Sequence, residues 1–142
     1  MALINKILGY RDFSKLEDIK NYIASNYSLE PGENILTAEG IIIFQTSRQK
    51  TWLIASEKKL FCVLDDIEND SFEVRWQMSK TDLFQGRNLN FEVKVNPNYS
   101  PTTGSVDLGN NHKEWLYSKK LYRSEAELKN SISDLILSKM NK

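Results

Sequence analysis

The strongest constraint on the fold is a series of short segments in which apolar and polar residues alternate. In FEVRWQM, from Phe72 to Met78, every second residue is apolar, and LNFEVKV, from Leu89 to Val95, repeats this alternation. Because successive side chains of an extended chain point to opposite faces, the pattern predicts β-strands that are buried on one side. The chain is therefore expected to fold around antiparallel sheet.

Further strands are predicted before and after these two. NILTAEGIIIFQTS is rich in β-branched residues and predicts one long kinked strand or two short ones, with Gly40 marking a bulge or a bend. Segments 51–56 and 60–64 predict a hairpin across EKK, while SVDL and EWLYS predict a final hairpin across GNN. The pattern gives about seven strands.

The C-terminus carries a helical pattern instead. Ser124 and Glu127 have the spacing of a capping box, and apolar residues follow at helical intervals at Leu128, Ile132, Leu135, Ile136 and Met140. An isolated helix of this length is marginal in water, so its apolar stripe is expected to cover a sheet or the mouth of a barrel. The core is predicted to contain apolar residues of the strands and of the helix, namely Trp52, Ile54, Phe72, Val74, Trp76, Phe91, Val93, Leu128, Ile132 and Leu135.

Residues 1–30 predict a helical N-terminal extension, which the turn-forming segment LEPGEN ends. Ser14 and Glu17 form a possible capping box at the start of one helix. Apolar residues also share one face of the first turns, namely Leu3, Ile4, Ile7 and Leu8.

Composition limits the classes of function. The 142 residues fit one domain, and 19 basic and 19 acidic residues cancel, so no global field favours nucleic acid or an anionic membrane. A single cysteine forms no internal disulfide, which favours a reducing, cytoplasmic setting. Asn5 and Lys6 interrupt the apolar N-terminus, so no signal peptide is predicted. No apolar run approaches the roughly 20 residues that span a bilayer, so we expect a soluble protein.

The order of about seven antiparallel strands and one closing helix resembles the pleckstrin-homology-like (PH-like) fold, including its bacterial and GRAM-type relatives. The resemblance rests on QKTWLIASEKKLFCVLDD, on GSVDLGNNHKEWLYSKKLY and on the closing helix, and covers roughly residues 33–140. It implies an α+β, mainly antiparallel roll or barrel of two orthogonal sheets, capped at one end by the helix. Residues 31–142 would form this domain, with residues 1–30 outside it. Such domains usually act as binding or scaffolding modules rather than as enzymes.

The resemblance also implies a place for a ligand, at the open end between the first two strands. There the loop TSRQKT offers Arg48 and Lys50, which in such a family would meet a phosphoinositide head group. Successive turns of a meander alternate ends, so the loop DDIENDS should lie beside it. The candidate ligand-binding residues are therefore the two bases together with the acids Asp65, Asp66, Glu68 and Asp70. These acids should repel a multiply charged phosphate, which disfavours membrane lipid as the ligand.

The cysteine and the histidine are each interpreted as structural rather than catalytic residues. Cys62 alternates with Leu60 and Leu64 and is predicted to be a buried apolar residue. His112 is the only histidine and lies in a predicted turn without a partner base, so a catalytic role is not predicted. The sequence shows no nucleotide-binding motif and no Cys/His metal framework, so no cofactor and no metal are expected.

Three further functions can be considered for the acidic loop and the segment 112–123, namely a catalytic pair of carboxylates, a cation site and nucleic-acid binding. Asp65 and Asp66 are adjacent and should point to opposite faces, so they are not expected to act as a catalytic pair. The alternating acids of the loop leave a cation site open, although a solvated turn is favoured because such a site needs six or more oxygen ligands. HKEWLYSKKLYR mixes bases and aromatics as single-strand binders do, but Trp115 and Tyr117 share one strand face and should be core, so nucleic-acid binding is not predicted.

These observations predict a non-catalytic interaction or scaffold module that binds a protein or peptide partner, for example against a sheet edge. Peripheral binding to phospholipid membranes is the first alternative. An enzyme of unknown type is the second.

Overall fold

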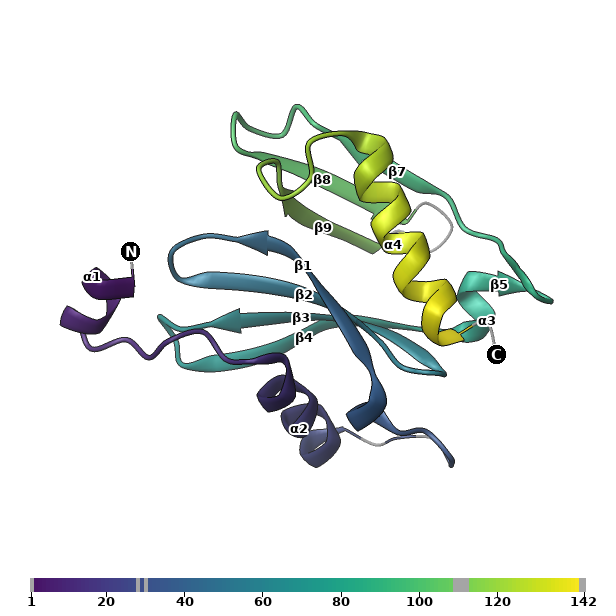
Figure 1. The fold of residues 1–142 in the computed structure, drawn as a ribbon, viewed down its shortest axis with the longest axis horizontal. Coiled ribbons are helices and arrows are strands. Elements are labelled where there is room, and N and C mark those ends of the chain that lie inside the picture. Colours follow the sequence, from purple (N-terminus) through teal and green to yellow (C-terminus); the bar gives the residue numbers. More distant parts are fainter. Residues whose placement is uncertain (1, 28, 30, 109–112, 141–142) are drawn as a thin grey trace.

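Two antiparallel sheets and a long C-terminal helix form the body of the protein (Figure 1). The computed structural model describes residues 2–27, 29, 31–108 and 113–140. The fold is α+β, as predicted, but the two larger sheets do not close into a barrel. Of the expected roll or barrel, the barrel is therefore wrong, and the roll stays a prediction.

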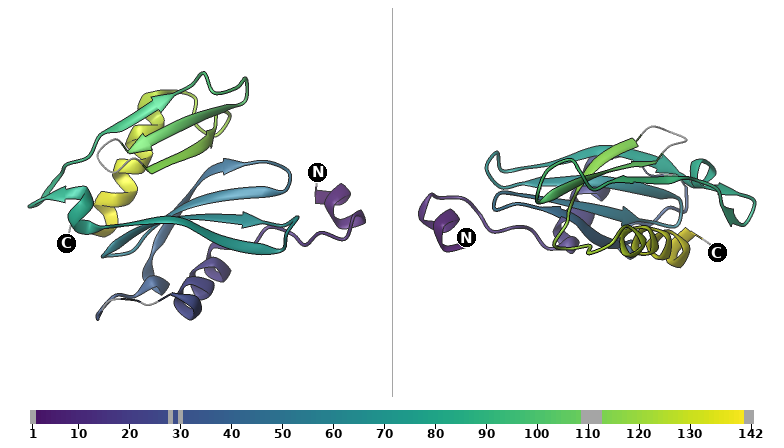
Figure 2. Two further views of the ribbon diagram at one scale, coloured as in Figure 1. Left: turned by 180° about the vertical axis from the view of Figure 1, so that it is seen from behind. Right: turned by 90° about the horizontal axis from the view of Figure 1, so that it is seen from above.

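The larger sheet is a meander in the order β1 (Glu39–Gln45), β2 (Gln49–Ala55), β3 (Lys59–Asp66) and β4 (Ser71–Ser79). Strand β3 is central and buried from Leu60 to Asp66 on both of its faces. One face meets the second sheet and the C-terminal helix, and the other meets an N-terminal helix (Figures 1 and 2). Apolar residues on both faces of β2 and β3 are therefore core residues.

Two bulges interrupt this sheet. One lies in β1 between Ile42 and Phe44, so the predicted bend is a bulge three residues after Gly40. The other lies opposite the step from Cys62 to Val63, where the register of β4 shifts around Arg75.

The bulge in β4 corrects the predicted single apolar face of FEVRWQM. Val74 pairs with Val63 and belongs to the core on the N-terminal helix side, whereas Trp76 pairs with Cys62 and belongs to the main core. The inserted residue changes the face of the sheet to which the residues after it point.

The second sheet has the order β7 (Val93–Asn96), β8 (Thr103–Leu108) and β9 (Lys113–Ser118). The predicted strand 89–95 is two pieces, because β6 (Asn88–Leu89) pairs instead with β5 (Phe84–Gln85) after the short helix α3 (Lys80–Leu83). Strand β9 lies beside β1, where the Ser118 hydroxyl accepts a 2.9 Å hydrogen bond from the Gln45 N–H.

The C-terminal helix α4 (Glu125–Met140) confirms the sequence prediction. Its buried residues are Leu128, Ile132, Leu135, Ile136 and Met140, the five that the pattern indicated. The Ser124 hydroxyl accepts a hydrogen bond from the Glu127 N–H at 3.1 Å, as a cap should. Helix α4 packs in the main core with both sheets.

Helix α1 (Ala2–Ile7), helix α2 (Leu16–Asn26) and the 3-10 turn η1 (Ile35–Thr37) precede the first sheet. Ile19 and Ile23 of α2 are fully buried against that sheet. The predicted capping residues are wrong by one position, because Asp18 accepts a 3.2 Å hydrogen bond from the Lys15 N–H. Within the described residues, no helix has the length and apolar character needed to cross a bilayer.

The predicted core is confirmed at its centre and only in part at its margins. Ile54, Leu128, Ile132 and Leu135 are buried. The other six pack against the core as half-buried residues, namely Trp52, Phe72, Val74, Trp76, Phe91 and Val93.

Candidate functional site

The predicted ligand-binding residues lie together at one end of the larger sheet. The N–H of Ile67, in the β3–β4 turn, donates a 3.0 Å hydrogen bond to the carbonyl of Arg48 in the β1–β2 turn. The Arg48 guanidinium also lies 3.5 Å from the Glu68 carboxylate. The two turns are thus side by side, as the meander order indicated.

An N-terminal arm, defined here as residues 2–14, crosses this end of the sheet and was not foreseen there. Arg11 places its Nη2 2.6 Å from Asp65 Oδ1 and its Nε 2.6 Å from Asp70 Oδ1. Asp65 is fully buried, and its second oxygen accepts the Ser14 N–H at 2.9 Å. Burial opposes the charge of Arg11, but the hydrogen bonds to the two acids raise its pKa.

Aromatic rings of the arm meet the predicted basic residues. The Arg48 guanidinium lies 4.8 Å from the centre of the Tyr10 ring, and the Lys50 ammonium lies 4.7 Å from the centre of the Phe13 ring. These distances permit cation–π attraction. The two bases that were expected to face a ligand therefore face the chain's own arm.

Asp66 is held within its own turn. Its carboxylate accepts hydrogen bonds from the side chain of Asn69 at 2.8 Å and from the backbone N–H of Asn69 at 3.1 Å. The bond from the Asn69 side chain is the main cause of a lowered Asp66 pKa. Among the described residues, no three His, Cys, Asp or Glu side chains converge as a metal site.

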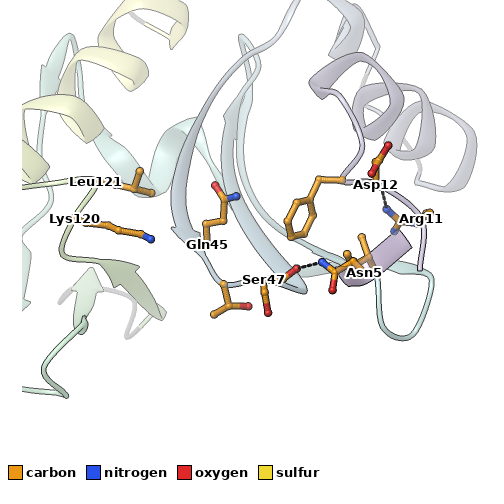
Figure 3. A pocket seen from close by; sticks show the side chains of 10 residues that line it. Asn5, Arg11, Asp12, Gln45, Ser47, Lys120 and Leu121 are labelled. Carbon is orange, nitrogen blue, oxygen red and sulfur yellow. Dashed lines mark hydrogen bonds between the residues drawn. The ribbon is translucent and has the colours of Figure 1, made fainter. Parts of the chain in front are cut away.

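A cavity of about 560 Å³ lies between the arm and the β1–β2 turn (Figure 3). Lys120 and Leu121, after β9, line one side, and Asn5 and Arg11 of the arm lie on the other. Asn5 donates a 2.6 Å hydrogen bond to the carbonyl of Ser47. Because the arm forms a wall, this cavity depends on the docked position of the arm.

A second cavity, the intersheet cleft, has about 530 Å³ between the inner face of β1–β4 and strand β9. Its apolar lining includes Cys62, Leu64 and Trp115, and two charged residues, Arg75 and Glu114, also line it. The volume lies in the range of ligand sites, and the lining is mixed, because Gln49, Thr51 and Ser105 also contribute polar groups. Arg75 follows Val74, which faces the N-terminal helix, and because of the bulge Trp76 after it also belongs to the main core.

Two residues of the cleft lining, Cys62 and Trp115, are buried. Burial raises the pKa of the Cys62 thiol to about 12, so the thiol stays protonated at neutral pH. Trp115 is only 7% exposed, its ring centre lies 5.2 Å from that of Trp76, and its indole N–H has no hydrogen-bond partner among the described residues. Within the part of the chain that the structure describes, the indole N–H groups of Trp52 and Trp76 are buried without a partner in the same way, so this feature of Trp115 is not particular to the cleft.

The sequence predicted the correct end of the sheet for the six charged candidate residues, but it did not reveal the arm or the cleft. The exposure of the apolar residues in and just after α1 was also unexpected, with Leu3 71%, Ile4 53%, Ile7 75% and Leu8 55% exposed. His112 lies outside the described residues. Comparison of the chain with family models, with curated proteins and with solved structures gave no match.

Proposed function

We propose that this chain is a non-catalytic PH-like interaction module that binds an extended segment of a partner protein in the intersheet cleft. The observation that carries the proposal is the cleft itself, which joins apolar residues such as Leu64 and Trp115 to charged and polar groups between the two larger sheets. The PH-like part rests on the four-stranded sheet, the three-stranded sheet and the closing helix α4.

A peptide fits the chemistry of the cleft better than a strongly charged ligand. Arg75 and Glu114 give its lining one positive and one negative charge, so their charges cancel. A peptide main chain presents N–H and carbonyl groups at regular intervals, and polar side chains of the lining such as Gln49 and Ser105 would pair with them. Its apolar side chains would contact the floor around Leu64.

The non-catalytic character and the cellular setting are parts of the same proposal. A nucleophilic cysteine needs a lowered pKa, whereas burial raises that of Cys62 to about 12. A single unpaired and buried cysteine is compatible with the reducing cytoplasm.

The test is selection of binding peptides from a random 12-residue display library on the wild-type protein. Ser105→Trp fills the cleft, because Ser105 lines it and is half-buried. We expect selected peptides to lose at least about tenfold in affinity on Ser105→Trp and on Arg75→Ala. The matched control is Arg87→Ala, which removes an exposed arginine outside the cleft lining.

The tryptophan indoles report the binding site directly. In a ¹⁵N-correlated NMR spectrum the chain gives three indole signals, one each for Trp52, Trp76 and Trp115. A peptide in the cleft should shift the Trp115 signal, while Trp52, which packs on the α2 side, should stay in place. Peptides that bind Ser105→Trp as well as the wild type and leave Trp115 unshifted would refute the proposal.

Peripheral membrane binding is the second candidate, favoured by the exposed apolar face of α1. Three large apolar side chains on α1, together with Leu8 just after it, form a surface that lipid would cover. Co-sedimentation with liposomes of phosphatidylcholine and phosphatidylserine, compared for the wild type and Leu3→Ser/Ile7→Ser, tests it. Binding that both proteins share, or no binding by either, would remove this candidate.

A further inference from the structure

The arm contacts at the end of the larger sheet have the form of a bound arginine side chain. Asp65 provides a carboxylate that is fully buried at the base, and Asp70 provides a second carboxylate at the surface. The Arg11 guanidinium carbon lies 5.3 Å from the centre of the Phe72 ring. A planar guanidinium satisfies two carboxylates and an aromatic face at once, which a lysine ammonium does less well.

We propose that this surface is a recognition site for an arginine side chain flanked by aromatic residues, and that the N-terminal arm occupies it as an internal ligand. The ligand class is an extended segment of a partner protein with the pattern aromatic, arginine, any residue, aromatic. Tyr10, Arg11 and Phe13 supply that pattern in the arm, against Arg48, the two acids and Lys50.

The site is built into the sheet rather than made by the arm. Asp65 lies in β3, paired with Phe72 of β4, and Lys50 of β2 pairs with Asp65 on its other side. Three neighbouring strands thus hold the buried carboxylate, the aromatic ring and one cation in fixed positions. The two acids, Asp65 and Asp70, attract an arginine side chain. The cations Arg48 and Lys50 attract the aromatic rings on either side of it.

The arm is bound by contacts that are exchangeable. Arg11 is 28% exposed, and the large apolar side chains of α1, such as Leu3 and Ile7, are not buried on the body. Departure of the arm breaks the ion pairs of Arg11 and uncovers the half-buried rings of Tyr10 and Phe13, while the buried Ile19 and Ile23 keep α2 in place. A partner segment of the same pattern would replace the contacts that the arm gives up.

The arginine site shares no side chain with the lining of the intersheet cleft. A partner segment competes with the arm, which is tethered and so present at high effective concentration. The apparent affinity for a partner is lowered by the fraction of molecules whose site the arm already fills. Removing Arg11 from the arm should therefore raise the affinity for the same chemistry supplied in trans.

The experiment titrates an acetylated and amidated peptide, LGYRDFS (residues 8–14), into full-length wild type, Arg11→Ala and Arg11→Ala/Asp65→Asn. We expect the peptide to bind Arg11→Ala at least about tenfold more tightly than the wild type. The same peptide with Gln in place of arginine should lose this gain, and Arg11→Ala/Asp65→Asn should lose it too. Equal binding of the two peptides, or no binding to Arg11→Ala, would overturn the proposal.

Methylguanidinium provides a second measurement that does not require Arg11→Ala to be stable. At up to about 20 mM it should raise the melting temperature of Arg11→Ala, or restore its folded signal, by filling the vacant site. Methylammonium at equal ionic strength is the control and should have a smaller effect. No difference between the two cations would show that the site does not recognise a guanidinium, and rescue without peptide binding would reduce Arg11 to a structural contact.

Discussion

The ion pair between Arg11 and Asp65 is expected to stabilise the fold through strong pairwise coupling. At an effective dielectric constant of 20, two unit charges 4 Å apart attract by about 4 kcal/mol, and dehydration of the ions offsets part of this. Loss of one partner of a fully buried pair costs about 3–5 kcal/mol. Because Arg11 keeps 28% exposure, we expect Arg11→Ala to lower the free energy of unfolding by about 2–3 kcal/mol.

Asp65→Asn should cost less, because the amide oxygen still accepts the Ser14 N–H and no charge is left buried. The double variant Arg11→Ala/Asp65→Asn should then be less destabilised than the sum of the two single variants, by about 1–2 kcal/mol. The assay is urea unfolding followed by tryptophan fluorescence at pH 7. The coupling should persist at 1 M NaCl, since a buried pair is poorly screened.

The chain offers a matched control in the exposed pair Arg48 and Glu68. Their side chains are 35% and 53% exposed and lie 3.5 Å apart. Arg48→Ala and Glu68→Gln should show coupling below about 0.5 kcal/mol that salt removes. If the coupling between Arg11 and Asp65 is no larger than that of this surface pair, the view of Asp65 as a buried anion that requires the arm is wrong.

Four further predictions concern stability and reactivity. Burial raises the Cys62 pKa to about 12, so the thiol should react with Ellman's reagent at pH 8 only in urea; native reactivity would contradict this. The Asn69 side chain lowers the Asp66 pKa, so Asp66 stabilises the fold above pH about 4 and loses this effect on acidification. Asp66→Asn should therefore lower stability at pH 7 and much less at pH 2.5, in paired urea titrations. A Cβ on Gly104 would overlap the Tyr117 ring, so Gly104→Ala should cost about 1–3 kcal/mol, and Gly104→Ala/Tyr117→Ala should show non-additivity. A chain that ends at Arg123 lacks α4 and should give no cooperative calorimetric transition; melting near the parent temperature would show that α4 is peripheral.

The elements that the sequence predicted well are those whose signals are local. The apolar residues of α4, such as Leu128 and Ile132, recur at helical spacing, and the Ser124 cap lies next to them. Only one packing face is available to such a helix. The pattern therefore indicated both the element and its buried side without knowledge of its partner.

The elements that were missed depend on pairing between distant residues. FEVRWQM alternates without interruption, so nothing within it marks the bulge that sends Val74 and Trp76 to different cores. The bulge is a property of the register with β3. The arm is a stronger case, because Arg11 and Asp65 are 54 residues apart and each looks like an ordinary surface charge in the sequence.

The two proposed surfaces use opposite faces of the same strands. Thr51 and Leu64 form one register pair and line the intersheet cleft, while the next pair, Lys50 and Asp65, contacts the arm. Neighbouring residues of a strand point to opposite faces, so the two sites share a backbone but no side chain. Energetic coupling between sites requires an element with two arrangements, and the continuously paired strands β2 and β3 provide none at this point. The cleft and the arginine site are therefore expected to bind their ligands independently, which lets the variants of one serve as controls for the other.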